Sequence, residues 1–172
     1  MMDISAREIQ ERLNAGETVR VESRSAEDTY ELGRLLGEGG LPGQIYTLTG
    51  DLGVGKTVFT QGFARGLGIL EPVNSPTFTI LREYEEGRLP FYHFDVYRIA
   101  DVEEMEEIGY EDCFYGGGIC LIEWADLIQE ILPEHSVQVT IEKNPPRGFD
   151  YREITLRKRE KTEENKEPDI VS

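Results

Sequence analysis

The segment GDLGVGKT, residues 50–57, constrains this chain more than any other stretch. It matches the pattern G-x-x-x-x-G-K-S/T, in which glycines let the backbone curl until successive N–H groups point at one anion. Residues 44–49 before it are rich in β-branched and aromatic side chains, and Phe59, Phe63 and Leu67 after it recur at helical spacing. The loop is therefore expected between a strand and a helix N-terminus, which adds further donors. This context favours a phosphate-binding loop over a glycine-rich turn that binds nothing.

Composition excludes several classes of protein. The 172 residues suffice for one domain, and 34 acidic against 18 basic residues give a net charge of −16, which disfavours strong direct binding of nucleic acid. Cys113 and Cys120 form no C-x-x-C pair, so neither a disulfide framework nor a zinc site is indicated. No signal peptide opens the chain and no segment has the length of a membrane span. We therefore expect a cytoplasmic protein without membrane contact.

The remaining pattern alternates between helix and strand. Capping patterns at Ser5 and Ser25 predict helix starts, and the apolar run ICLIE, residues 119–123, predicts a central parallel strand. Residues 77–84 and 89–96 flank a turn and are expected to form a β-hairpin. Together these elements predict an α/β fold of the P-loop NTPase type, with central parallel strands, a β-hairpin and flanking helices.

The chain divides into three predicted parts. Residues 1–18 form an N-terminal extension, residues 19–157 a P-loop ATPase domain, and residues 158–172 a charged tail. The tail is expected to be disordered because it has too few apolar residues to build a core.

Two acidic residues are candidates for nucleotide chemistry beside the loop. Lys56 is expected to neutralise the β- and γ-phosphates and the Thr57 hydroxyl to bind Mg²⁺, but a protein acid is normally needed as well. Asp95 ends LPFYHFD and Glu123 ends ICLIE, and strand-end carboxylates emerge at the ligand-binding edge of α/β sheets. Glu123 follows the more apolar strand and is the predicted metal acid, with Asp95 orienting the attacking water or coordinating through water. The alternative for each is a solvated strand-end acid.

A threonine after the first nucleotide-binding helix has two interpretations. Thr77 in NSPTF, residues 74–78, can report the γ-phosphate as in nucleotide switches. It can equally begin a strand after a turn that Pro76 fixes.

Four motifs in this order and at these distances resemble the bacterial TsaE family, the ATPase component of tRNA threonylcarbamoyladenosine biosynthesis: GDLGVGKT, SPTF, HFDVYR and LIEWAD. The resemblance runs from about residue 19 to about residue 156. It implies a compact α/β P-loop protein that binds ATP and Mg²⁺ and hydrolyses ATP slowly. It also implies that the protein, a monomer outside its complex, associates with TsaD and TsaB and supports their modification of tRNA.

The resemblance assigns roles to residues by position. It implies phosphate contacts from Leu52, Gly53, Val54, Gly55, Lys56 and Thr57, and magnesium ligands in Thr57 and Glu123. It implies catalysis by Asp95 together with Lys56, with Thr77 in a switch-like loop, and a nucleotide-side position for Glu27 and Arg152.

Two further side chains lie within the motifs. Trp124 directly follows the predicted metal acid and can either sense the site or only pack against it. His93 is expected to be structural, because no neighbour in the sequence suggests a partner for proton transfer.

Other classes of protein share a phosphate-binding loop of this kind. Guanine specificity lacks support, because the nearest string to N-K-x-D, NKEPD at residues 165–169, is one residue too long and lies in the tail. A small-molecule kinase would add a mobile, arginine-bearing lid, whereas residues 103–118 are acidic, end in three glycines and resemble a partner-facing element. A nucleotide-gated interaction module without significant turnover is the third alternative.

Overall fold

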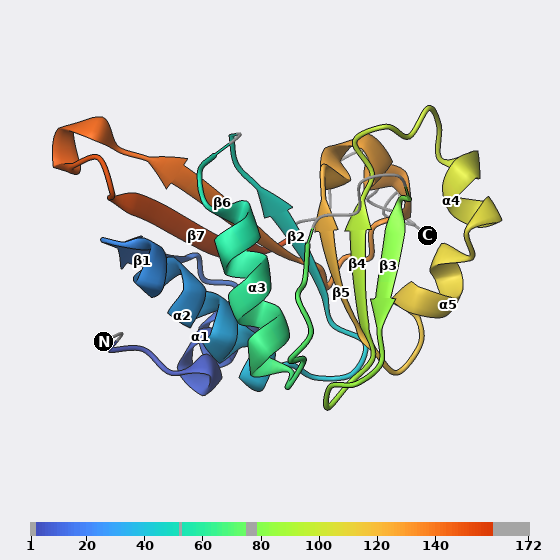
Figure 1. Cartoon of the computed structure of the whole chain (residues 1–172), viewed down its shortest axis with the longest axis horizontal. Helices are drawn as coiled ribbons and strands as arrows, with labels where there is room; N and C mark the ends of the chain where they lie inside the picture. The colour runs from blue at the N-terminus through green and yellow to red at the C-terminus, as the bar shows by residue number, and fades with distance from the viewer. Residues whose placement is uncertain (1–2, 52, 75–78, 160–172) are drawn as a thin grey trace, which may run out of the picture.

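A single mixed sheet organises the computed structural model, which describes residues 3–51, 53–74 and 79–159. Its seven strands lie in the order β1-β7-β6-β2-β5-β4-β3 (Figure 1). Neighbours β6, β2, β5 and β4 are parallel, whereas β7 and β3 run antiparallel to the strands they pair with. The strands are β1 Val19–Ser23, β2 Ile45–Thr49, β3 Leu81–Tyr84, β4 Phe91–Asp95, β5 Ile119–Glu123, β6 Val137–Lys143 and β7 Arg152–Lys158. The predicted α/β class with central parallel strands is confirmed.

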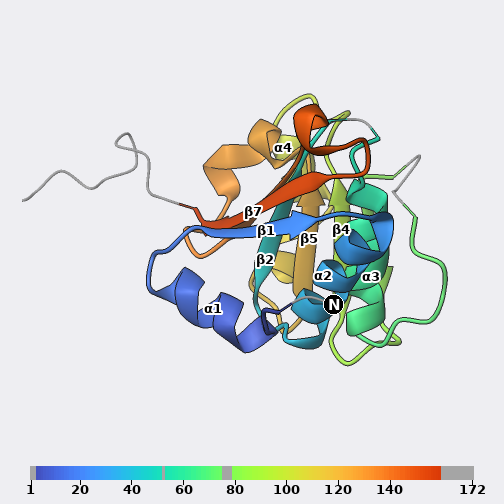
Figure 2. The same ribbon diagram turned by 90° about the vertical axis from the view of Figure 1, so that its left-hand side faces the viewer.

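Helices cover both faces of this sheet (Figure 2). One face carries α1 Ala6–Asn14, α2 Ala26–Glu38 and α3 Lys56–Gly66, and the other carries α4 Glu103–Glu107, α5 Tyr110–Phe114 and the 3₁₀ helix η1 Ala125–Ile131. A short 3₁₀ turn, η2 Pro145–Arg147, lies between β6 and β7. Strand β5 is buried on both faces: Ile119 and Leu121 pack toward α3, and Cys120 and Ile122 toward α5. This explains its unbroken apolar sequence.

Two serines begin helices as the sequence predicts. Ser5 Oγ accepts a hydrogen bond of 3.1 Å from the Glu8 N–H, and Ser25 Oγ accepts one of 3.2 Å from the Asp28 N–H. Each hydroxyl satisfies a backbone donor that the first helical turn leaves without a partner.

The predicted hairpin is present but shorter than expected. Strands β3 and β4 pair antiparallel from Leu81 opposite Phe94 to Tyr84 opposite Phe91. The predicted strand start at residue 77 lies outside the described residues, and residues 79 and 80 form a bend rather than a strand. The Thr79 hydroxyl donates to the Leu81 carbonyl at 3.2 Å, and the Asp95 N–H donates to the Ile80 carbonyl at 2.8 Å, so one bond to β4 reaches Ile80 although residues 79 and 80 bend.

Both predicted terminal segments contribute to the domain where the structure describes them. Ile9 and Leu13 of α1 are buried in the core beside α2. Strand β7 continues to Lys158, opposite Val137, and so passes one residue into the predicted tail. Residues 160–172 lie outside the described residues, and their disorder remains a prediction.

Helices α2 and α3 are packed backbone against backbone through glycines. A Cβ on Gly33 or Gly37 of α2 would lie 2.3 Å from the Phe59 carbonyl oxygen or 2.0 Å from that of Phe63. A Cβ on Gly62 of α3 would lie 2.0 Å from the Tyr30 carbonyl oxygen. No larger residue fits at this distance, so the glycines fix how closely the helix after the phosphate loop approaches its neighbour.

An arginine in the turn of the hairpin binds the C-terminal end of α2. Arg88 Nη2 donates to the carbonyl oxygens of Gly37, Glu38 and Gly40 at 2.9, 3.0 and 2.9 Å. The guanidinium thus satisfies carbonyls that the helix terminus leaves without partners. Among the described residues no helix is both long and apolar enough to cross a membrane.

We expect Gly62→Ala to lower the free energy of unfolding by about 2–3 kcal/mol through overpacking, although alanine favours helices by about 1 kcal/mol. Urea denaturation followed by circular dichroism measures the change. Gly117→Ala is the control, because Gly117 is exposed and a Cβ there meets no atom within 4 Å. Equal stability of the two variants would contradict the proposed packing constraint.

Candidate functional site

The phosphate-binding motif forms the connection between β2 and α3. Gly53 and Gly55 have φ angles of 77° and 118°, in the left-handed region that favours glycine. The Val54 N–H donates to the Asp51 carbonyl at 3.1 Å, and α3 begins at Lys56. The strand, loop and helix expected from the sequence are therefore present, and the helix N-terminus faces the loop. Leu52 lies outside the described residues.

The parallel register brings the two predicted acids to the same sheet edge. In β5, Glu123 is opposite Leu48 of β2 on one side and opposite Asp95 of β4 on the other. Glu123 lies on the same face of β5 as Leu121, and Asp95 lies on the same face of β4 as Phe91. Both acids therefore face the side of the sheet that α3 covers. Glu123 is 5% exposed, and Asp95 is partly exposed.

Asp95 has an environment that suits a proton acceptor. Burial raises the pKa of its carboxyl group, and the nearby charge of Glu123 adds to the rise. The Tyr97 N–H, which donates to Asp95 Oδ1 at 3.1 Å, acts in the opposite direction on this pKa. A raised pKa moves a carboxylate toward the range in which general bases operate.

His93, which the sequence left without a suggested partner, has a hydrogen-bond partner in the structure. Its Nε2 lies 3.1 Å from Glu123 Oε2, and the two residues are 1% and 5% exposed. The contact joins adjacent strands 30 residues apart in the chain. The available signal was the two-residue spacing of His93 and Asp95, which places both on one face of a strand.

Lys56 is held against aromatic side chains. Its Nζ lies 4.9 Å from the centroid of the Trp124 ring, and the Trp124 and Tyr97 rings are 4.8 Å apart. Trp124 has a φ of 63° and is the one non-glycine residue with positive φ in the described chain. Trp124 therefore packs directly against the phosphate-loop lysine, and a role in sensing the site stays a prediction.

Cavities border the loop on both sides. One, of about 730 Å³, lies between Lys56, Trp124 and the end of β6. Another, of about 190 Å³, lies between Gly53, the start of α2 and Arg152. Arg152 Nε donates to the Val54 carbonyl at 2.8 Å, so this predicted nucleotide-side residue contacts the loop. Glu27 is exposed on the first turn of α2 and does not line either cavity.

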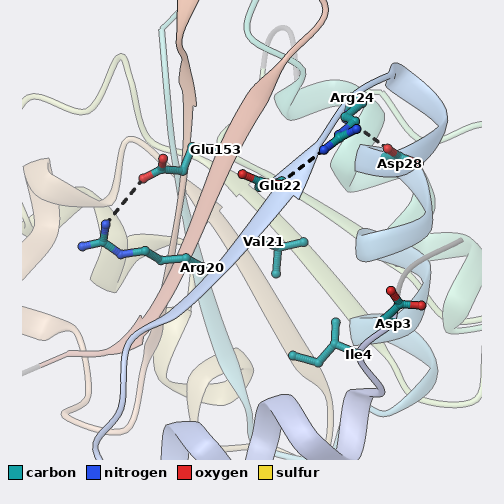
Figure 3. Close-up of a pocket in the computed structure, with 8 residues that line it drawn as sticks. All are labelled: Asp3, Ile4, Arg20, Val21, Glu22, Arg24, Asp28 and Glu153. Atoms are coloured by element: carbon teal, nitrogen blue, oxygen red, sulfur yellow. Dashed lines mark hydrogen bonds and ion pairs between the residues drawn. The ribbon is translucent and has the colours of Figure 1, made fainter. Parts of the chain in front are cut away.

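A third cavity, of about 770 Å³, lies over the edge strand β1 (Figure 3). Arg20 pairs with Glu153 at 3.9 Å and Arg24 with Glu22 at 3.8 Å. The lining has four carboxylates, from Asp3, Glu22, Asp28 and Glu153, against two guanidinium groups. This balance does not suit a phosphate group, and none of the motif residues contributes to the cavity.

The residues around the loop fit a magnesium nucleotide. The loop offers backbone donors and Lys56, the Thr57 side chain is exposed at the helix start, and Glu123 lies at the facing strand end. In the described parts of the chain no group of three or more His, Cys, Asp or Glu side chains can hold a metal by itself. Phosphate oxygens and water would therefore complete the coordination, as Mg²⁺ prefers. Thr77 lies outside the described residues.

Fold and loop together define a protein with a P-loop-like fold. Residues 23–154 match the family model described as "Threonylcarbamoyl adenosine biosynthesis protein TsaE". The chain belongs to the TsaE family.

Named relatives support this membership. The tRNA threonylcarbamoyladenosine biosynthesis protein TsaE of Bacillus subtilis is 52% identical over 130 residues, which cover 76% of this chain and 79% of that protein. The protein of the same name from Treponema pallidum is 46% identical over 123 residues, covering 72% and 90%. The crystal structure of B. subtilis YdiB aligns with a TM-score of 0.70 and 43% identity, over 81% of this chain and 84% of that one.

We expect magnesium ATP to change the fluorescence of Trp124, because phosphates would draw Lys56 away from the indole ring. Trp124 is the single tryptophan of the chain, so all tryptophan emission comes from this residue. A fluorescence titration with ATP measures the change. Lys56→Ala should abolish the ATP response, because it removes the charge that contacts phosphate. An unchanged titration in this variant would refute the assignment of the loop.

Proposed function

We propose that this protein is a magnesium-dependent, slowly hydrolysing ATPase that supports the TsaD–TsaB enzyme in forming threonylcarbamoyladenosine on tRNA. Membership of the TsaE family implies a P-loop ATPase. The observation that best supports the proposal is the alignment of the loop, Glu123 and Asp95 at one sheet edge.

The proposed roles follow from charge and position. Lys56 and the N–H groups of residues 53–57 bind the phosphates, and Thr57 and Glu123 hold magnesium at the start of α3. When bound, magnesium neutralises the charge that develops on the phosphate oxygens. Asp95 orients the attacking water and accepts its proton, since its raised pKa favours proton acceptance.

The structure disfavours a small-molecule kinase. Residues 103–118, the segment considered above as a lid, contain neither arginine nor lysine. Met105, Tyr110 and Phe114 of this segment are buried in the core cluster beside β5. A segment packed in this way cannot close over a transferred phosphate without disrupting that core, so ATP hydrolysis is the better-supported reaction.

We expect the two acids to separate binding from turnover. Glu123→Gln should weaken magnesium-dependent ATP binding about tenfold or more, because it removes a charged ligand. Asp95→Asn should keep binding and lose hydrolysis by about a hundredfold or more. Calorimetric titration with ATP and phosphate release measure the two effects. Loss of binding in Asp95→Asn, with Glu123→Gln unaffected, would reverse the assignment.

Nucleotide-dependent association is the proposed link to tRNA modification. A chain with net charge −16 suits contact with partner proteins better than direct binding of tRNA. If the loop after α3 responds to the γ-phosphate, the ATP and ADP forms present different surfaces, and hydrolysis resets the complex. The coupling cannot exceed the difference in partner affinity between the two forms.

We expect light scattering to detect stronger association with TsaD and TsaB in ATP than in ADP or without nucleotide. Lys56→Ala is the control and should associate equally in all three conditions. Equal association of the unmodified protein would contradict the switch, and tight binding of tRNA by this protein alone would contradict the choice of partner.

A further inference from the structure

The contact between His93 and Glu123 is an enclosed polar pair directly beneath the proposed magnesium site. The residues are 1% and 5% exposed, and Nε2 lies 3.1 Å from Oε2. A carboxylate oxygen only accepts hydrogen bonds, so the imidazole Nε2–H is the donor. Glu123 adjoins Asp95 and Leu48 in the register, at the end of β5 nearest the phosphate loop.

Packing alone does not account for a histidine at this position. The imidazole stacks on Phe91 with ring centroids 6.1 Å apart and 7° between planes, and Phe91 packs on Phe63 of α3 at 5.6 Å. An apolar side chain would fill such surroundings without the cost of burying polar nitrogen atoms. Nδ1 is buried and has no hydrogen-bond partner among the described residues. In that part of the chain Glu123 is therefore the single hydrogen-bond partner of the imidazole.

We propose that His93 is a positioning residue, which orients the Glu123 carboxylate toward the magnesium ion of bound ATP. The inference rests on the proposed function. The aromatic stack fixes the imidazole plane from the core side, and the Nε2–H fixes one carboxylate oxygen. Holding one oxygen sets the plane of the carboxylate and hence the direction of its second oxygen. Hydrogen bonds to metal ligands commonly change metal affinity by about 10- to 100-fold.

The test compares three substitutions of His93. His93→Leu removes the donor and keeps an apolar side chain. His93→Gln places an amide nitrogen near the position of Nε2, whereas His93→Asn has the same amide on a side chain too short to reach Glu123. His135→Leu is the matched control, because the other histidine of the chain is exposed and lies 3.2 Å from the Gly43 carbonyl oxygen.

Calorimetric titration of ATP at a series of Mg²⁺ concentrations, and in EDTA, measures the effect. We expect His93→Leu and His93→Asn to need about tenfold or more Mg²⁺ for the half-maximal gain in ATP affinity. Their affinity in EDTA should stay close to that of the unmodified protein. His93→Gln should restore most of the magnesium response, which a merely structural role would not predict.

Two results would overturn the inference: a normal magnesium response in His93→Leu, or equal responses of folded His93→Gln and His93→Asn. The second comparison decides the matter if His93→Leu does not fold. Failure of the proposed function can be told apart from failure of this inference, because the unmodified protein would then show no magnesium response at all. If Glu123→Gln loses the response and His93→Leu retains it, the proposed function stands and the inference alone fails.

Discussion

Parallel pairing of β5 between β2 and β4 is the constraint on which the site depends. This register places Leu48, Glu123 and Asp95 side by side, directly before the phosphate loop leaves β2. Side chains alternate between the faces of a strand, so a slip of one residue would move Glu123 to the face opposite α3. The two-sided burial of β5 opposes such a slip, because a slip would exchange the side chains that fill the two core clusters.

The elements around the loop restrict its position from several directions. Glycines bring α2 and α3 into backbone contact, and Arg88 satisfies the end of α2 from the hairpin turn. On the opposite side of the loop, Arg152 of β7 binds the Val54 carbonyl and the carbonyls of Phe149 and Tyr151, each at 2.8 Å. A binding site needs this kind of support, because its geometry is only as precise as the residues that hold it.

Local sequence was sufficient for some of these features. The phosphate loop, the helix starts at Ser5 and Ser25 and the strand that ends at Glu123 are each specified within about ten residues, where propensity and pattern apply. The class of fold followed from the alternation of predicted helices and strands along the chain. The roles assigned to the site residues remain predictions.

Features that join distant segments could not be predicted. The contact of His93 with Glu123 depends on which strands are neighbours, and the glycine contacts of α2 with α3 depend on how two helices cross. Neither is encoded at a fixed spacing in the chain. The strand expected from residue 77 begins only at Leu81 in the described chain, because residues 79 and 80 bend, a local geometry that propensity does not reveal.

We propose that Glu123 and Thr57 hold the metal of a nucleotide bound in the loop. A crystal structure with Mn²⁺ and a non-hydrolysable ATP analogue tests it directly, because anomalous scattering locates the manganese independently of the surrounding atoms. We expect one peak between the Thr57 hydroxyl and the Glu123 carboxylate, with Asp95 on the side of the attacking water. A peak bound directly by Asp95, or one away from the loop, would contradict it.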